Sequence, residues 1–170
     1  MILIVDDDAS VHASLGLLLK QAGHAWAAAS SRAEAVSWLA ANPCDLVLQD
    51  MNFRREATSG EEGVALFRAI RRAHPDVPVV LLTAWTQLET AVELVRAGAA
   101  DYLAKPWDND RLVTTVRNLL QLRAALEESR QRQQRIDAAR DELAARFDLR
   151  GIVYASPAMH TVVQMATQVA

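Results

Sequence analysis

The chain has 170 residues, of which 51% are hydrophobic and 23% are charged, so its length suits one domain with an attachment and its composition excludes wholesale disorder. The formal net charge of -3 gives no reason to expect nucleic-acid binding, and no apolar run approaches the roughly 18 residues that a membrane span needs. One cysteine, Cys44, cannot form an internal disulfide, which fits a reducing compartment and predicts a cytoplasmic protein.

Short apolar segments alternate with segments of helical periodicity through residues 1–107. Apolar runs that end in polar residues predict buried parallel strands. We expect these strands at 2–5, 24–29, 46–48, 79–82 and 101–104. The helices between them are marked by their ends: Gly23 closes the first, Ser31 and Glu34 form a capping box that opens the second, Pro75 follows the third, and Gly98 stops the fourth.

Five strand–helix repeats of this kind predict an α/β fold with a five-stranded, doubly wound parallel sheet and helices on both faces. In such sheets the ligand site lies beyond the carboxyl ends of the strands. The polar residues at these ends are Asp6, Asp7 and Asp8 after the first strand, Asp50 after the third, Thr83 after the fourth and Lys105 after the fifth. We therefore expect all of them at one edge of the sheet.

Several carboxylates in a small volume repel one another, by roughly 4 kcal/mol for two charges about 4 Å apart at an effective dielectric constant near 20. Mg²⁺ would relieve that repulsion, because oxygen ligands suit it. The ammonium of Lys105 and the hydroxyl of Thr83 would complete a set suited to phosphoryl transfer to an aspartate. Each residue alone has a simpler explanation, such as a helix cap for Asp8. Only the combination favours the functional interpretation.

This combination resembles the receiver domain of two-component response regulators, which has a flavodoxin-like fold. The matching segments are Ile4-Val5-Asp6-Asp7, Asp50, Leu81-Leu82-Thr83-Ala84, Asp101-Tyr102-Leu103 and Lys105-Pro106. The resemblance covers residues 1–120, and it implies that Asp50 accepts a phosphoryl group from a sensor histidine kinase.

The resemblance also implies roles for individual residues. Mg²⁺ would be bound by the side chains of Asp7 and Asp50 and by the backbone carbonyl of Asn52, with Asp6 acting through water. Lys105 would pair with the phosphoryl oxygens and Thr83 would donate a hydrogen bond to the phosphoryl group. Tyr102 would act as an aromatic switch. The switch would carry the change to the face formed by the fourth helix, the fifth strand and the fifth helix.

The segment after Asp50 departs from the common receiver pattern. Met51-Asn52-Phe53 stands where a Met-Pro turn is common nearby, and the stretch to Glu62 is several residues longer than usual. This predicts an enlarged loop at 51–60 beside the phosphorylation site. Arg54 and Arg55 in that loop either contact the phosphoryl group or the kinase, or lie in solvent as most such residues do.

A stretch without glycine or proline runs from Asp108 to Asp148. As a continuous helix it would span roughly 60 Å at about 1.5 Å per residue, too long to lie on so small a domain, so we expect a coiled coil. Spacing of three and four places the apolar residues Leu119, Leu122, Leu126, Ile136, Leu143 and Phe147 on one stripe. Polar residues interrupt its middle, which is typical of a switchable dimer. A solvated helix or a flexible linker is the alternative.

The last residues resemble the opening of the AAA+ ATPase domain in sigma-54-dependent activators of the NtrC class. Ser156-Pro157-Ala158-Met159 carries the likeness, although Tyr154 stands where a glycine is usual. The 170 residues contain no Gly-x-x-x-x-Gly-Lys phosphate loop, so this stretch is not an ATPase by itself. We expect a receiver at 1–120, a helical dimerisation linker at 108–149 continuous with the last receiver helix, and the first residues of an ATPase domain at 150–170.

We therefore expect a phosphorylation-activated receiver of a two-component transcriptional regulator. It would be no enzyme beyond Mg²⁺-dependent phosphoryl transfer to its own aspartate and the hydrolysis of that group. Phosphorylation of Asp50 would rearrange a homodimer through the linker helix. In the intact protein the further partners would be ATP, sigma-54 RNA polymerase and DNA, with no membrane partner.

Two other functions remain open from the sequence. A phosphohydrolase of the haloacid-dehalogenase kind would use Asp6 as its nucleophile, but residue 10 is serine rather than the expected threonine or valine. A phosphorylation-independent dimerisation module would keep the receiver fold alone. Mapping the phosphorylated residue separates the first from a receiver, and loss of Mg²⁺ binding would favour the second.

Overall fold

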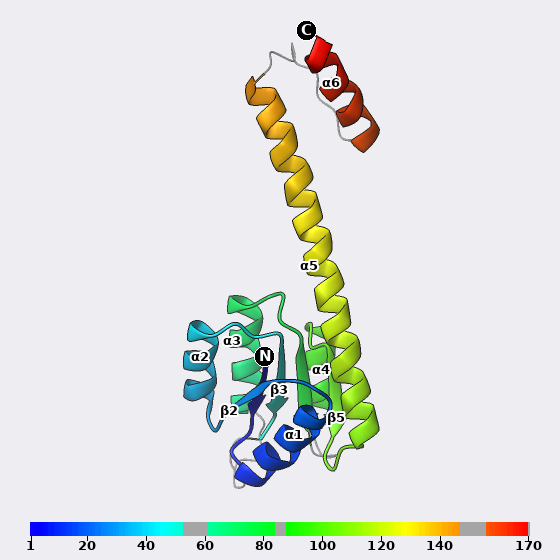
Figure 1. The fold of residues 1–170 in the computed structure, drawn as a ribbon. Coiled ribbons are helices and arrows are strands. Elements are labelled where there is room, and N and C mark those ends of the chain that lie inside the picture. The colour runs from blue at the N-terminus through cyan, green and yellow to red at the C-terminus, as the bar shows by residue number, and fades with distance from the viewer. Residues whose placement is uncertain (53–60, 84–87, 147–155, 170) are drawn as a thin grey trace. The chain divides into compact units, whose positions relative to one another are not determined.

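Figure 1 shows a computed structural model of the protein, which describes residues 1–52, 61–83, 88–146 and 156–169. The chain forms two compact units, Met1–Ala124 and Ala125–Ala170. None of the described helices combines the length and the apolar character of a membrane span.

The first unit is built on one sheet of five parallel strands (Figure 1). The strands are β1 (Ile2–Val5), β2 (Trp26–Ala29), β3 (Leu46–Asp50), β4 (Val79–Thr83) and β5 (Asp101–Ala104). Their order across the sheet is β2-β1-β3-β4-β5, which confirms the predicted doubly wound topology. The order changes direction between β1 and β3, and such a switch point is where open parallel sheets bind ligands.

Helices cover both faces of this sheet. They are α1 (Ala9–Gln21), α2 (Arg32–Ala41), α3 (Glu61–Ala73), α4 (Leu88–Arg96) and the start of α5 (Asn109–Arg146). One core cluster joins the sheet to α2, α3 and α4 and includes Leu39, Phe67 and Leu94. The other joins it to α1 and α5 and includes Leu19 and Leu112. Every residue of β1, β3 and β4 is buried between these layers, which is why their sequences are apolar runs rather than alternating patterns.

The predicted helix caps lie where the sequence places them. The Asp8 side chain caps α1 and accepts from the N–H of Ser10 at 2.8 Å. Ser31 caps α2 and accepts from the N–H of Glu34 at 3.2 Å. The Glu34 carboxylate reaches back to the N–H of Ser30 at 2.8 Å, so the capping box closes one residue earlier than its usual form.

The second strand is shorter than predicted and begins at Trp26 rather than at residue 24. Its Trp26 side chain lies across Gly16 of α1, where an added Cβ would come within 2.2 Å of the indole ring. The strand is otherwise alanine, and it lies at the edge of the sheet. The absence of a side chain at Gly16 therefore lets the large Trp26 side chain pack closely on α1.

The first turns of α5 are part of the first unit. Leu112 and Val116 are fully buried, and Leu119 packs against the same cluster. One turn further on, Arg123 donates from Nη1 to the carbonyl of Asp76 at 3.0 Å, and its Nε lies 3.7 Å from Oδ1 of Asp45. The helix is thus fixed to the sheet layer as far as residue 123.

The residues of the predicted apolar stripe on α5 differ in how far they are buried within the single chain. Leu122 and Leu126 are 57% and 54% exposed, so they are available for contacts that the single chain does not make. Leu119 already packs against the core, and its part in a dimer stays a prediction. Phe147 lies outside the described residues, and so does the side chain of Leu143.

The second unit contains the later turns of α5 and the helix α6 (Pro157–Val169). Ser156 caps α6, because its hydroxyl accepts from the N–H of Met159 at 3.2 Å. Pro157 occupies the first helical position, where its fixed φ and missing N–H cost nothing. The Ser-Pro-x-Met segment singled out in the sequence is therefore the start of a helix.

Candidate functional site

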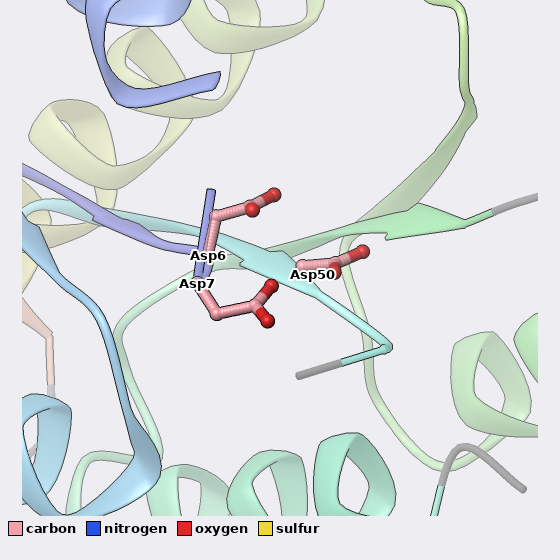
Figure 2. Close-up of side chains that lie close together, drawn as sticks. All are labelled: Asp6, Asp7 and Asp50. Atoms are coloured by element: carbon pink, nitrogen blue, oxygen red, sulfur yellow. The ribbon is translucent and has the colours of Figure 1, made fainter. Parts of the chain in front are cut away.

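Three carboxylates converge at the carboxyl edge of the sheet (Figure 2). Asp6 and Asp7 follow β1 directly and Asp50 ends β3, and one ligand atom from each lies within 4.8 Å of the others. β1 and β3 are neighbours in the sheet, so the strand order brings Asp50 to the other two. Asp6 and Asp50 are 1% and 4% exposed, whereas Asp7 is open to solvent.

One ammonium group is shared by the two buried carboxylates. Nζ of Lys105 lies 2.7 Å from Oδ2 of Asp6 and 3.0 Å from Oδ1 of Asp50. Lys105 follows β5, and its backbone N–H donates to the carbonyl of Thr83 at 2.7 Å. That bond continues the pairing of β4 with β5 and fixes the point from which the lysine side chain reaches across to the acids.

Burial and the charges at this edge shift the pKa values of both Asp50 and Lys105. Burial raises the pKa of the Asp50 carboxyl above its ordinary value; Lys105 and the N–H of Asn52 lower it and Asp6 raises it, without reversing the shift. Burial lowers the pKa of the Lys105 ammonium, but its hydrogen bonds and ion pairs with Asp6 and Asp50 outweigh that effect, so this pKa is raised. Lys105 therefore stays charged. Its single positive charge does not balance the three carboxylates of Asp6, Asp7 and Asp50.

The donor set fits a hard divalent cation such as Mg²⁺, which prefers carboxylate and carbonyl oxygens. Asp6 already accepts the N–H of Asp8 at 2.9 Å and the ammonium of Lys105. Within the described residues no hydrogen bond or ion pair reaches the carboxylate of Asp7. Asp7 is thus better placed than Asp6 to hold a cation directly, and Asp50 lies within reach of the same ion.

Of the remaining predicted residues, Thr83 and Tyr102 are described by the structure, and the two arginines of the enlarged loop are not. Thr83 is 1% exposed at the end of β4 and pairs in register with Ala104 of β5. Tyr102 is half-buried on β5 and packs against the core cluster under α3 and α4. The enlarged loop lies outside the described residues from residue 53 onward, including Arg54 and Arg55.

Sequence reasoning missed one polar residue beside the pocket. Gln49 precedes Asp50 on β3, is fully buried, and donates from Nε2 to the carbonyl of Gly63 at 2.7 Å. The apolar run was expected to end at Leu48, and a polar residue after a strand usually faces solvent. The structure instead places Gln49 inside β3, where all five residues are buried.

Residues 2–117 match the family described as the response regulator receiver domain, which accounts for the sheet topology and for the cluster of Asp6, Asp7 and Asp50. The chain belongs to this family. The phosphohydrolase alternative is set aside accordingly, and Asp6, which it would use as nucleophile, is a buried partner of Lys105. The predicted receiver fold is confirmed.

The receiver is related to transcriptional regulators. It is 36% identical over 169 residues to the transcriptional regulatory protein ZraR of Salmonella typhimurium, which covers 99% of this chain and 34% of that protein. It is 36% identical over 113 residues to the DNA-binding transcriptional regulator NtrC of Escherichia coli, covering 66% of this chain and 23% of that one. The chain thus spans about one third or less of these curated relatives.

Solved structures give the same relationship. The receiver domain of NtrX from Brucella abortus has a TM-score of 0.65 at 30% identity, covering 71% of this chain and 98% of that one. A crystal structure of NtrX from Brucella abortus in complex with ADP has a TM-score of 0.71 at 27% identity. The latter match covers 96% of this chain and 33% of that one. The receiver is therefore related to NtrC-family regulators along most of its length.

Replacing the shared cation tests the electrostatics of the site. Lys105→Met should lower the free energy of unfolding at pH 7 without Mg²⁺ by about 3 kcal/mol, because two buried carboxylates lose their partner. The loss should shrink at pH 5, since the pKa of Asp50 is already raised and a protonated carboxyl no longer needs the ammonium. Urea unfolding at both pH values measures this. Lys20→Met, an exposed change on α1, is the control, and equal losses at both pH values would contradict the electrostatic explanation.

Proposed function

We propose that Asp50 accepts a phosphoryl group from a sensor histidine kinase in the presence of Mg²⁺. The observation that carries this is the triad of Asp6, Asp7 and Asp50 with Lys105 bonded to two of its members. A carboxylate oxygen of Asp50 would attack the phosphorus of the kinase phosphohistidine, a P–O bond would form, and the P–N bond to imidazole would break. Mg²⁺ supplies charge neutralisation for the phosphoryl oxygens and the acids.

The surrounding residues then have separate tasks. Asp7, Asp50 and the backbone carbonyl of Asn52 would hold the metal ion, with Asp6 acting through water because its own oxygens are occupied by the Asp8 N–H and Lys105. A phosphoryl group adds nearly two negative charges at pH 7. Lys105 would transfer one of its contacts to that group.

The same new charge would operate the switch. The Thr83 hydroxyl, at the end of the buried strand β4, would hydrogen-bond the phosphoryl oxygens. Tyr102 would follow inward from its half-buried position on the neighbouring strand β5. The two arrangements form a two-state element whose balance phosphorylation changes.

The output would pass through α5. This helix begins inside the receiver and continues without a break to Arg146, so a rearrangement at β5 and α5 reaches the exposed leucines directly. We propose that it forms the dimerisation linker, with the receiver at 1–120, the linker at 108–149 and the start of an ATPase domain at 150–170. In the intact cytoplasmic protein this arrangement would control a sigma-54 activator that uses ATP and binds RNA polymerase and DNA.

Tryptophan fluorescence tests the central step. Trp107 packs against the core cluster beside α5 and serves as the probe, while Trp85 lies outside the described residues. A fluorescence change on adding Mg²⁺ and then beryllofluoride, lost in Asp50→Asn, would support the proposal, and sizing the same samples would follow the dimer. No response in either protein would favour the phosphorylation-independent dimerisation module instead.

A further inference from the structure

Gln49 is a buried amide at a position where the rest of the strand is apolar. It is 0% exposed and lies in register between Val5 of β1 and Leu81 of β4. Val47, two residues earlier, belongs to the core cluster under α2, α3 and α4, and alternation along a strand places Gln49 on the same face. A polar group in such a place is destabilising unless it is hydrogen-bonded, so its partners show what it does.

Among the described residues the amide makes one hydrogen bond, and that bond leads to α3. Nε2 donates to the carbonyl of Gly63, in the first turn of the helix, at 2.7 Å. Oε1 has no partner among the described residues. A leucine or methionine would fill the same space without leaving an unpaired oxygen, so packing alone does not explain a glutamine. The contribution particular to the amide is its hold on Gly63.

Gly63 lies directly on the backbone that follows the phosphoacceptor. A Cβ added at Gly63 would come 2.5 Å from the carbonyl oxygen of Met51 and 2.8 Å from its Cα. Because these are backbone atoms, no side-chain rotation could make room. The first turn of α3 therefore rests on Met51, and Gln49 holds that turn from the strand side.

The same backbone carries the next contact of the site. The N–H of Asn52 donates to the carboxylate of Asp50, and the carbonyl of Asn52 is the expected further metal ligand. Met51, between them, is 1% exposed and belongs to the core cluster. The position of the Asn52 peptide relative to Asp50 thus depends on how closely α3 packs on Met51.

We propose that Gln49 is a positioning residue for Mg²⁺ binding, which acts by holding the first turn of α3 on Met51 and thereby the Asn52 peptide beside Asp50. The inference rests on the proposed phosphorylation of Asp50. Gln49 contributes no ligand atom. It removes freedom from a backbone segment that must present one, in the way that groups behind metal ligands commonly act.

Gln49→Leu and Gln49→Met replace the amide with an apolar side chain of similar size and so remove the donor. Each should raise the Mg²⁺ dissociation constant, measured by calorimetry, by about 10-fold, the effect typical of a lost group behind a metal ligand. At saturating Mg²⁺ the rate of phosphorylation by acetyl phosphate should return close to that of the wild type, because no reacting group has changed. Gly63→Ala, which pushes on Met51 from the other side, should weaken Mg²⁺ binding as well.

Leu46→Ala is the matched control. It removes buried volume from the same strand, at the opposite end and in the opposite core cluster, without touching α3. Its Mg²⁺ affinity should equal that of the wild type at a temperature where circular dichroism shows every variant folded. Should Gln49→Leu not fold, Gln49→Met carries the test, because methionine is unbranched and adapts to irregular space.

Three outcomes would overturn the inference. Unchanged Mg²⁺ affinity in a folded Gln49 variant would leave the amide with a packing role. Equal weakening in Leu46→Ala would assign the effect to general destabilisation. If the wild type itself bound no Mg²⁺, the proposed function would fail and this inference with it, and that result is distinct from the first two.

Discussion

Asp50→Asn is expected to abolish phosphorylation and yet to unfold at a higher temperature than the wild type when Mg²⁺ is absent. An amide is no nucleophile for phosphoryl transfer, so mass spectrometry after incubation with acetyl phosphate should find no phosphoryl group on the variant. The gain in stability arises because a buried charge is removed from a group of three carboxylates. We expect about 1 kcal/mol, or a rise of roughly 2–4 °C in melting temperature.

The pKa of Asp50 determines whether Asp50→Asn stabilises or destabilises the folded protein. It is raised in the folded protein even though Lys105 lies 3.0 Å away, so burial and the repulsion by Asp6 outweigh the attraction of the ammonium. A raised carboxyl pKa means that the folded state gains stability from protonation below the ordinary pKa and loses that contribution as the pH rises through the raised value. The advantage of Asp50→Asn should therefore be largest at neutral pH and shrink on acidification.

Mg²⁺ should make the wild type more stable than Asp50→Asn. A ligand that binds only the folded state stabilises it by about 2.7 kcal/mol at a concentration 100 times its dissociation constant. The wild type would gain that amount, whereas Asp50→Asn, which lacks one of the carboxylate ligands, would gain much less. Asp110→Asn, an exposed aspartate in the first turn of α5, is the control and should behave like the wild type. If Asp50→Asn were less stable than the wild type without Mg²⁺, the charge argument would be refuted.

Most of the fold could be predicted because its strands are buried on both faces. Such strands are continuous apolar runs, and the residues that end them, such as Asp50 and Thr83, are polar. Parallel pairing then brings strand ends to one edge without further information. The strand at 26–29 has the weakest sequence pattern, since its alanines carry little strand preference, and the contact of Trp26 with Gly16 of α1 cannot be read from that pattern.

The pairings within the site could not be predicted in the same way. That Lys105 contacts Asp6 more closely than Asp50 depends on the path of one flexible side chain across the sheet edge. The role of Gln49 depends on Gly63, which is fourteen residues further along the chain. Patterns of period two or 3.6 report which face a residue occupies, and they do not report which partner it meets.

Leu119 shows the same limit on α5. Heptad spacing selects residues on one stripe of a helix, but a helix packed on its own domain and a helix packed on a partner chain have nearly the same period. In this chain Leu119 packs against the receiver core, while Leu122 is exposed one turn further on. The change from internal packing to an exposed stripe therefore falls close to Arg123, which ties α5 to the sheet layer.

If α5 forms the proposed dimer seam, Leu122→Glu combined with Leu126→Glu is expected to convert that dimer to a monomer while the receiver stays folded. Both side chains are more than half exposed in the single chain, so charging them should cost little within it. In a two-stranded coiled coil each would be buried against its partner, and burying a leucine contributes about 1.5–3 kcal/mol. Because two chains lose two leucines each, the dimer dissociation constant should rise at least about 100-fold.

The matched control is Gln121→Glu combined with Ala125→Glu. It adds the same charge to exposed positions immediately preceding the two leucines on the same helix, outside the predicted stripe. Sedimentation equilibrium over a range of concentrations should find the control as dimeric as the wild type and the leucine variant monomeric. The same melting temperature for both variants in dilute solution would show that the receiver is intact. If the leucine variant dimerised as the wild type does, α5 would not be the dimer seam, and phosphorylation would have to reach any output through another surface of the receiver.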